Sequence, residues 1–591
     1  MVSHLIGIVQ EFFRSRIKTY AFIFFLLCLA SFSYLPILIN IDFPARGDWD
    51  HAFFTNAVPF ITIKEFHQFP FWNPFYCGGF SYIASPESTL FSIQTIFSLL
   101  TQDVITATKV NVVFHAFIGL AGMWLLCLHF ELKFFSTLVA MGIFVFNGCM
   151  SSQIGEGPLD RFSIFFLPWI VLFFLKSHQK NHYVVWTGLA LALMFYDKGG
   201  YTFIFTVLFL AIYSAISSLL RRDIKFLVCF FFVLLFWVGF SAPKLFPLLT
   251  TMSAYPRLTK PGHAFDILKL LHMYVFRNPD PFGFLPRPFN YWGWWEFNAY
   301  VGIMPFALFL GGLTLRKYAS WCLCAAIFFV ISIGNFGPWS LWALLHRLPV
   351  FNTMQIPNRD NTVFIFILAF LAGAFLNEIE QRAKNKKGMI FLVAILSVFI
   401  LVDLVGYTRF VFQKVLRPFP LGDVQFSKSR PFEQIRMPRE QIVSSGAWSH
   451  MYAAILQNKG TINGYCRVPF KRYAKAGQDR GYRGEFFLKE KNGDVQLVLW
   501  SPNQIVYKYD LVRADRLVIN QNYDRDWRVQ GDIKTESFRG LLSVPLNSGK
   551  GEVVFYYFPS FFLWGLCVFC FTCILSVVIV RKNLNKARSG S

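Results

Sequence analysis

The stretch Arg46-Gly47-Asp48-Trp49-Asp50-His51 stands directly after the first hydrophobic run of the chain, and the rest of the sequence is organised around it. The run before it, residues 20–39, supplies the roughly twenty apolar residues that cross a bilayer core. Two carboxylates and a histidine are therefore expected at a membrane surface. Ionisable residues in that position predict a membrane protein with a polar site at the end of its first helix.

Composition places the whole chain in the membrane class. Of its 591 residues, 55% are hydrophobic, 19% are aromatic and 15% are charged, and the mean hydropathy is +0.45. A soluble protein cannot bury that much apolar surface. The formal net charge of +23 lies mostly at the ends of apolar segments and in one late hydrophilic segment. This distribution indicates membrane lipids, and not nucleic acid, as the charged partner.

Twelve apolar segments are expected to cross the membrane. Their predicted bounds are 20–39, 104–128, 134–150, 162–175, 183–196, 201–220, 226–248, 298–315, 318–334, 361–377, 389–408 and 559–580. Lys and Arg gather at alternate ends of these segments, and the positive-inside rule places those ends and both termini in the cytoplasm. The loops 40–103, 249–297 and 335–359 then lie outside. Residues 51–66 and 87–100 have apolar residues at helical spacing and are expected to lie along the interface.

The long hydrophilic segment 409–558 divides the chain. We expect a transmembrane module over 1–408, an extracytoplasmic domain over 409–558, and a last helix with a basic cytoplasmic tail over 559–591. From about residue 495 polar and apolar residues alternate, and turn signals such as Asn492-Gly493 separate the runs, which predicts an antiparallel β-sandwich. The predicted fold is a polytopic α-helical membrane protein with a β-rich domain near its C-terminus.

Asp48 and Asp50 are the candidate catalytic residues. A carboxylate can take the proton of an attacking hydroxyl, and it can hold a divalent cation that neutralises a phosphate leaving group. Gly47 lets the backbone bring Asp48 close to a ligand, and His51 is a further candidate ligand if a metal binds. The alternatives are that Asp48 caps an interfacial helix over residues 52–60 and that His51 is structural.

Trp72 and Asn73 belong to an aromatic loop, Phe71-Trp72-Asn73-Pro74-Phe75, which leads to Gly78-Gly79. Trp offers a flat apolar face to a sugar ring, and Asn offers a donor and an acceptor. Both are therefore candidates for substrate binding. The alternative is an aromatic-belt residue followed by a turn.

Charged residues at other outside ends are candidates for binding the charged part of a substrate. They are Glu156, Asp160 and Arg161 between the third and fourth spans, Lys198 between the fifth and sixth, and Arg287 in the loop 249–297. The alternative for each is a solvated loop residue or a contact with a lipid headgroup.

Arg359 follows Pro357 at the outside start of the span predicted over 361–377. A helix N-terminus and a guanidinium both favour an anion, which predicts a phosphate-binding residue. Snorkelling to a lipid headgroup is the alternative.

Motifs that are absent from the sequence argue against several classes of function. It has no Walker-type loop and no GxSxG motif, so ATP-driven transport and serine hydrolysis are unsupported. Few carboxylates lie in the middle of a predicted span, and the nearest case, Asp403, lies near the outside end of the span over 389–408. This scarcity argues against a proton- or sodium-coupled transporter, which needs such residues at the midplane. No pair of cysteines has zinc-ribbon spacing together with a partner pair of His or Cys. Cys77 and Cys466 both face the oxidising side in this topology, and a disulfide between them stays open. The first apolar run lacks a cleavage site and is expected to be a retained helix.

Several short motifs, taken in order, resemble the YfhO-type bacterial membrane proteins of the GT-C glycosyltransferase superfamily. They are Gly47-Asp48, Phe71-Trp72-Asn73-Pro74-Phe75 with Gly78-Gly79, Ala242-Pro243-Lys244-Leu245-Phe246-Pro247, Tyr300-Val301-Gly302, Gln355-Ile356-Pro357-Asn358-Arg359, and Leu517 to Trp527 with Phe555 to Pro559. Two features depart from the family pattern. Gln355 stands where a second Arg is frequent, which puts a paired phosphate clamp in doubt, and Arg525-Asp526 replaces a Pro-Gly turn.

The resemblance implies a GT-C-like glycosyltransferase of the bacterial inner membrane. It would move a sugar from a polyprenyl-phosphate donor to a cell-envelope glycan, polymer or glycolipid on the extracytoplasmic face. By carry-over, Asp48 would be the general base or a ligand of a divalent cation, and Arg359 would bind the donor phosphate. The residues alone predict a membrane-embedded site for a lipid-linked polar substrate. Two other functions stay open, namely a lipid-linked glycan transporter and a non-catalytic envelope assembly protein.

Overall fold

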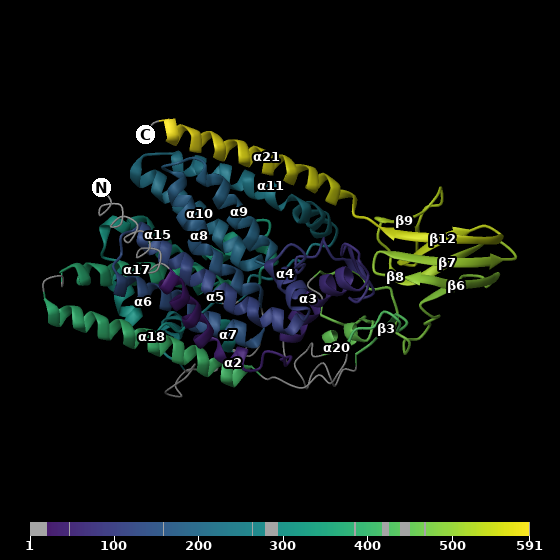
Figure 1. Ribbon diagram of the computed structural model, residues 1–591, viewed down its shortest axis with the longest axis horizontal. Coiled ribbons are helices and arrows are strands. Elements are labelled where there is room, and N and C mark those ends of the chain that lie inside the picture. The colour runs from purple at the N-terminus through teal and green to yellow at the C-terminus, as the bar shows by residue number, and fades with distance from the viewer. Residues whose placement is uncertain are drawn as a thin grey trace, which may run out of the picture.

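The computed structural model describes residues 20–45, 48–157, 159–262, 264–277, 294–382, 386–416, 425–437, 450–465 and 468–589. A bundle of helices fills one end of an elongated molecule, and a β-rich domain lies at the other end (Figure 1). Helix α3 (Asp48–Lys64) lies between these two parts, so the stretch that opens it stands at their junction (Figure 1).

Eight helical segments of the described residues are long and apolar enough to cross a membrane. They are α5 (Val104–His129), α6 (Phe134–Val145) with α7 (Gly148–Glu156), α10 (Gly200–Arg221), α11 (Lys225–Ala254), η2 (Arg316–Tyr318) with α15 (Ala319–Ile333), η4 (Pro357–Asp360) with α17 (Asn361–Arg382), α18 (Lys387–Val415), and α21 (Ser560–Ser589).

Shorter helices occupy the other predicted spans. Apolar helices over Tyr20–Ser33, α9 (Tyr183–Tyr196) and α14 (Ile303–Gly312) fall on the first, fifth and eighth, and α8 (Leu167–Ser177) falls on the fourth. Helix α2 (Leu35–Leu38) lies at the end of the first predicted span. Short helices lie in the connections between spans, namely α4 (Ile93–Thr101), α12 (Ile267–Val275), α13 (Trp294–Phe297), α16 (Leu341–Leu345) and η3 (Phe351–Thr353).

The bounds of several predicted spans need correction. Helices α11, α17, α18 and α21 each run five or more residues past the predicted end. The third span was expected to end at residue 150, but the helical path continues to Glu156 because the side chain of Asn147 accepts the N–H of Met150 at 2.9 Å and starts a new helix. The eighth span was expected to begin at residue 298. It begins at Ile303, because Gly302 has a φ of +90° and cannot continue a helix backwards.

Helix α3 is not the interfacial helix that was expected over residues 51–66. Fourteen of its 17 residues are buried, and it packs against α4, α5 and α20 (Met451–Leu456). A helix that is buried over nearly its whole length lies inside the protein and not on a membrane surface. Helix α4 does expose Ile96 and Leu100, as an interfacial helix should.

The basic turns of the bundle lie at the end away from the β-rich domain. Asn377, near the end of α17, accepts the N–H of Lys133 at the start of α6 at 3.0 Å, which brings these two basic helix ends together. The C-terminal end of α21 lies at the same end of the molecule (Figure 1). This is the arrangement that the predicted topology requires. The compartment that each end faces stays a prediction.

The sandwich domain (residues 486–557) consists of two four-stranded antiparallel sheets. One sheet has the strand order β10-β11-β8-β5 and the other β6-β7-β12-β9. The strands are β5 (Phe486–Leu488), β6 (Gly493–Trp500), β7 (Gln504–Leu511), β8 (Asp515–Asn522), β9 (Trp527–Val529), β10 (Glu536–Phe538), β11 (Leu541–Leu546) and β12 (Gly549–Tyr557). Leu517 and Val544 of one sheet and Tyr507 and Phe555 of the other share one apolar core. The predicted β-rich domain is confirmed.

Two small sheets connect the sandwich domain to the first loop. Strands β1 (Trp72–Asn73) and β2 (Phe80–Ser81) form a short hairpin in that loop. Strands β3 (Glu433–Ile435) and β4 (Lys459–Thr461) pair in parallel beside α20. The backbone of Thr461 accepts the N–H of Cys77 at 2.9 Å and donates to Phe75 at 3.0 Å, so the two regions are one unit.

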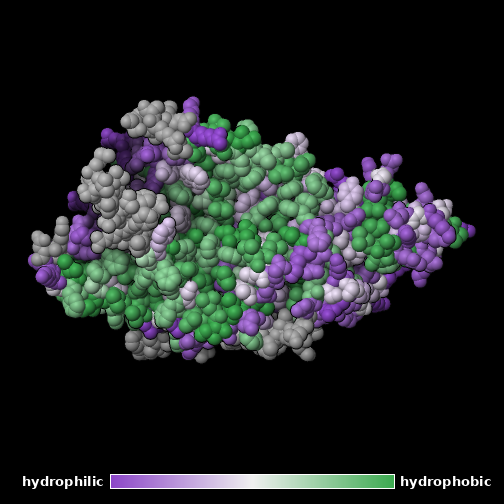
Figure 2. Space-filling model, in the orientation of Figure 1, coloured by the Kyte–Doolittle hydropathy of each residue, from purple (hydrophilic) through white to green (hydrophobic). Residues whose placement is uncertain are grey.

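The surface separates the two parts by polarity. Hydrophobic residues cover much of the visible bundle, whereas hydrophilic residues gather over the sandwich domain (Figure 2). Helix α21 exposes Trp564 at 69% and Phe571 at 67%. Large apolar side chains exposed along helices of this length face lipid. The protein is therefore a polytopic α-helical membrane protein with a β-rich domain near its C-terminus.

Candidate functional site

Asp48 is the first residue of α3, and the end of α7 fixes its position. Gly157, which follows α7, has a φ of +106°, and a Cβ placed on it would lie 2.2 Å from the backbone N of Trp49. The indole of Trp49 also donates to the carbonyl of Gly155 at 3.0 Å. The end of α7 therefore meets the start of α3 at Gly155 and Gly157.

Asp50 connects α3 to the domain after α18. Its carboxylate accepts the N–H of Met451 at 3.0 Å and that of Tyr452 at 3.3 Å, so it caps α20. Burial raises the pKa of Asp50 to about 7, against the effect of these N–H groups. Asp48 and Asp50 were both candidate catalytic residues, with helix capping as the alternative. Asp50 does cap a helix, but that helix is α20 and not the one expected over residues 52–60.

The ring of His51 in α3 contacts Glu87 of the first loop. Its Nε2 lies 2.9 Å from Oε1 of Glu87, and the hydroxyl of Tyr76 donates to Oε2 of Glu87 at 3.2 Å. Tyr76, Glu87 and Asn73 line a cavity of about 10 Å³, which has room for about one water molecule. This cavity is too small for a sugar. The Oδ1 of Asn73 accepts the N–H of Phe75 at 3.1 Å and shapes the turn.

Trp72 lies in the core of the sandwich domain. It is 1% exposed, and its indole donates to Oε1 of Gln521 at 2.7 Å. The rings of Trp527 and Tyr557 pack on it at centroid distances of 5.5 and 4.8 Å, and a Cβ on Gly79 would meet it at 2.5 Å. Protein atoms cover the ring, so in this structure it offers no face to a sugar.

Arg359 stands in η4, directly before α17, as expected. Its guanidinium makes a fork-like pair with Glu296 of α13, with Nε at 3.1 Å from Oε2 and Nη2 at 2.5 Å from Oε1. It also lies over the ring of Tyr201 at 4.4 Å from the centroid. A bidentate pair and an aromatic face hold this side chain in one orientation.

Arg161 brings a second guanidinium to the same place. It lies 5.2 Å from the centroid of the Tyr201 ring, 3.6 Å from Oδ1 of Asp160, and it is 1% exposed. Burial raises the pKa of Glu296, but Arg359 and Arg161 lower it more, so it stays below its usual value and the carboxylate is charged. We call Gln153, Asp160, Arg161, Tyr201, Glu296 and Arg359 the arginine cluster.

The same short helix contacts both Asp48 and the arginine cluster. Gln153 of α7 donates to Oε2 of Glu296 at 3.3 Å, and one turn later the chain at Gly155 and Gly157 contacts the start of α3. Helix α7 therefore contacts the helix start that carries Asp48 and also the carboxylate that pairs with Arg359.

Asn358 is a buried amide next to Arg359 in the chain. It is 1% exposed, and neither Nδ2 nor Oδ1 has a hydrogen-bond partner in the part of the chain that the structure describes. An unsatisfied buried polar group costs about 1–3 kcal/mol. Natural structures retain such groups rarely, and a polar ligand would satisfy this one.

Lys198 contacts α3. Its Nζ donates to Oγ1 of Thr55 at 2.6 Å and to Oδ1 of Asn56 at 3.3 Å. These bonds hold the turn between α9 and α10 against the middle of α3. The sequence grouped Lys198 with Arg161 and Arg359 as a substrate contact, and that role stays a prediction.

Three predictions lie outside the described residues or next to them. Arg287, Gly47 and Cys466 are not among the residues that the structure describes, so the role of Arg287 and the Cys77–Cys466 disulfide stay predictions. Cys77 donates to the carbonyl of Gly464 at 3.4 Å. Within the described ranges no group of three or more His, Cys, Asp and Glu side chains is arranged to hold a metal ion, and a divalent cation stays an open question.

Sequence reasoning missed Glu296, Tyr201 and Asn358. Glu296 ends a Trp-rich stretch and Tyr201 follows a Gly-Gly pair, and neither pattern points to an ion-pair partner. Asn358 stands inside the Pro-Asn-Arg motif that drew attention to Arg359, so it could have been included with it.

A larger cavity of about 640 Å³ lies along the second half of α3. Its lining includes Ala57, Lys64, Asp103, Phe426 and Tyr452. Asp48 and Arg359 are not among its lining residues, but Tyr452, whose N–H contacts Asp50, is.

No family model matches the chain, and no curated protein matches its sequence. Among solved structures, the arabinofuranosyltransferase AftD from Mycobacteria, determined by single-particle cryo-EM, is similar over 70% of this chain with a TM-score of 0.47 and 13% sequence identity. The match covers 29% of the AftD chain.

Proposed function

We propose that this protein is an integral membrane glycosyltransferase. It transfers a sugar from a polyprenyl-phosphate donor to a cell-envelope glycan, polymer or glycolipid, at the membrane face that carries the sandwich domain. The observation that carries this proposal is the arginine cluster with the unsatisfied amide of Asn358, placed one short helix away from Asp48. This arrangement suits a phosphate and a reacting hydroxyl in neighbouring positions.

The arginine cluster suits the donor phosphate. Two guanidiniums, Arg161 and Arg359, face Tyr201 from η1 (Leu159–Phe166) and η4, and guanidiniums bind phosphate oxygens in pairs. In the family pattern a second arginine is frequent at the position of Gln355. In this proposal Arg161 supplies that second arginine from another loop. The exposed apolar surface of the bundle gives the polyprenyl chain a place in the lipid.

Asp48 suits the role of general base. In the proposed step, the acceptor hydroxyl attacks the anomeric carbon, the bond from that carbon to the phosphate oxygen breaks, and its electrons leave with the polyprenyl phosphate. The hydroxyl proton passes to the carboxylate of Asp48. Proton transfer by a positioned side chain typically contributes about 10²–10⁴-fold to the rate. Arg359 and Arg161 stabilise the charge that grows on the leaving phosphate.

The other predicted residues take supporting positions in this proposal. Asp50 and Lys198 hold α3 by its start and its middle, and Trp72 attaches the first loop to the sandwich domain. The resemblance of the Gly47-Asp48 and Pro357-Asn358-Arg359 motifs to the YfhO-type GT-C proteins supports the same assignment of Asp48 and Arg359. In this proposal the protein lies in the bacterial inner membrane and both of its termini lie in the cytoplasm.

The purified protein in lipid vesicles tests this function. Vesicles would contain a panel of polyprenyl-phosphate sugars, an envelope extract would supply acceptors, and mass spectrometry would measure free polyprenyl phosphate. We expect its release with at least one donor and its loss in Asp48→Asn. Movement of the donor across the bilayer without release would favour the transporter. Binding of envelope glycan with neither release nor movement would favour the assembly protein.

A further inference from the structure

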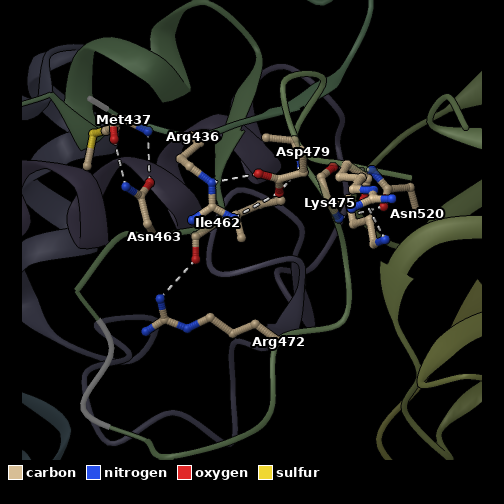
Figure 3. A network of polar contacts seen from close by, with 10 residues as sticks. Arg436, Met437, Ile462, Asn463, Arg472, Lys475, Asp479 and Asn520 are labelled. Atoms are coloured by element: carbon tan, nitrogen blue, oxygen red, sulfur yellow. Dashed lines mark hydrogen bonds and ion pairs between the residues drawn. The ribbon is translucent and has the colours of Figure 1, made fainter. Parts of the chain in front are cut away.

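A second polar pocket lies between the β3–β4 region and the sandwich domain. It has a volume of about 330 Å³, and Figure 3 shows most of its residues. The pocket, called here the basic pocket, is lined by Arg436, Ile462, Asn463, Arg472, Tyr473, Ala474, Lys475 and Asp479. None of these residues belongs to the arginine cluster, so the pocket is a separate feature of the molecule.

The walls of the basic pocket are fixed by hydrogen bonds. Arg436 donates from Nε and Nη2 to the two carboxylate oxygens of Asp479, each at 2.8 Å (Figure 3). The hydrogen bond from Arg436 holds the pKa of Asp479 at about 2, so the pair stays charged at any physiological pH. The side chain of Asn463 accepts the N–H of Met437 at 2.8 Å and donates to its carbonyl at 2.7 Å. A pocket with fixed walls loses little conformational freedom when a ligand binds.

The pocket carries more positive than negative charge. Arg436, Arg472 and Lys475 stand against one carboxylate, that of Asp479. Because Arg436 is paired with Asp479, Arg472 and Lys475 supply the excess. Both are exposed, and each is held by a backbone carbonyl, Arg472 by Ile462 at 3.0 Å and Lys475 by Arg480 at 2.9 Å. The remaining donors of these two side chains suit an anion.

Tyr473 adds an aromatic surface to the same pocket. A Cβ on Gly540 would lie 2.1 Å from the Tyr473 ring, so the ring rests on the bare backbone of that glycine. Gly540 has a φ of +87°, which few other residues adopt. The ring is still 42% exposed. A supported aromatic ring beside two cations suits a ligand that combines an apolar sugar face with a negative charge.

The basic pocket lies close to the start of α3. Asn463 lines the pocket, and Tyr465, two residues later, packs edge-on against His51 at a centroid distance of 5.3 Å. Two residues of chain span at most about 7 Å. A Cβ on Gly78 of the first loop would lie 2.7 Å from Ala474, another lining residue. A glycan chain bound in the pocket is therefore within reach of the α3 start.

We propose that the basic pocket binds an anionic segment of the glycan acceptor, with a carboxylate or phosphate on Arg472 and Lys475 and a sugar ring on Tyr473. Its role for the acceptor rests on the proposed function, whereas the binding of an anionic saccharide does not. The pocket holds the polymer while its hydroxyl end reaches the site beside Asp48. Neutral glycans lack the charged group and bind weakly.

Calorimetry with the full chain in detergent tests this site. The probes are a hexamer of galacturonic acid for the carboxylate, a glycerol-phosphate oligomer for the phosphodiester, and maltohexaose as the neutral control. We expect at least one anionic probe to bind and maltohexaose not to bind. The anionic probe that binds identifies the charged group. Failure of both to bind would overturn the proposal, even if the transferase reaction is observed.

Matched variants locate the binding. Arg472→Gln and Lys475→Gln should each weaken binding of the anionic probe by about tenfold, the effect of one lost charge-assisted contact. Arg513→Gln removes an exposed arginine from the turn between β7 and β8 and should change nothing. An equal loss in all three would show unspecific attraction to a basic domain and overturn the assignment. Unchanged melting temperatures show that each variant is folded.

Discussion

Gly157 lies so close to Trp49 that no side chain fits between them. A Cβ on Gly157 would be 2.2 Å from the backbone N of Trp49 and 2.6 Å from the backbone C of Asp48. Gly157→Ala must therefore push the start of α3 away from α7. We expect this variant to lower the release of polyprenyl phosphate by at least tenfold, although it changes no charged group. The vesicle assay described above measures the effect.

Gly549→Ala is the matched control for that variant. Gly549 has a φ of +107°, close to the +106° of Gly157, but nothing lies within 4 Å of its added Cβ. Both variants pay for an unfavourable backbone conformation, and only Gly157→Ala adds a clash. Equal activity of the two variants would mean that contact between α7 and α3 is not required.

Asp48→Asn should remove transfer while the donor still binds. An essential general base is worth about 10²–10⁴-fold in rate, and Asn keeps the shape of the side chain without its basicity. Asp50→Asn should be milder, because an amide can still cap α20. Turnover of both variants in vesicles checks this prediction. If Asp50→Asn alone abolishes transfer, Asp50 is the base and Asp48 is not.

Arg359→Lys and Arg359→Ala test the donor phosphate. Loss of a charge-assisted contact costs about 1.5–3 kcal/mol, so Arg359→Ala should raise the donor concentration for half-maximal transfer at least tenfold. Lys should recover only part, because it keeps the charge and loses the fork. The acceptor dependence should stay nearly unchanged. A shift in the acceptor dependence instead would place Arg359 on the acceptor side.

The variant Glu296→Gln tests whether Arg359 binds the donor phosphate or only holds η4 in place. Arg359 pairs with Glu296 in the absence of a ligand. If Arg359 binds the phosphate, Glu296→Gln frees its guanidinium and the donor should bind at least as well. If the pair only holds η4 in place, both Glu296→Gln and Arg359→Ala should lower the melting temperature and donor binding together, because breaking a buried pair is strongly destabilising.

Much of the bundle could be predicted because its signal is local. Apolar length identifies a helix such as α5, and charge at its ends gives its direction. The alternation of polar and apolar residues from about residue 495 predicted the sandwich domain in the same way. The burial of α3 could not be predicted, because the partners of this helix include α20, some four hundred residues later. Pairing over that distance leaves no periodic pattern in either segment.

The candidate site was predictable only where one residue carries an unusual chemistry. Asp48 after a glycine and Arg359 after a proline stand out at span ends. Their partners do not, since Glu296 and Tyr201 become meaningful only when η4, α13 and α10 meet. Trp72 shows the opposite error. Its chemistry suits a sugar platform, but its position in the sandwich core is decided by Gln521 and Trp527.

The raised pKa of Asp50 predicts a pH effect on stability. Burial raises it to about 7, whereas an unfolded Asp has a pKa of about 3.9. Between these values the folded state holds a proton that the unfolded state has lost, so folding stability decreases as the pH rises from about 4 to 7. Melting temperatures in detergent at pH 5 and pH 8 should show this decrease in the wild type. Asp50→Asn should show a smaller one, and an equal decrease in both would assign the effect to other groups.

Trp72→Ala should loosen the sandwich domain from the first loop. Removing a buried Trp costs about 3–5 kcal/mol, and Gln521, which is 2% exposed, also loses its partner. We expect faster proteolysis of residues 486–557, measured in detergent by mass spectrometry of the fragments. Trp564→Ala removes a Trp that is 69% exposed on α21 and should leave the digestion unchanged. If Trp72 is instead a platform for a sugar, Trp72→Ala should resist the protease like the wild type and raise the acceptor concentration for half-maximal transfer.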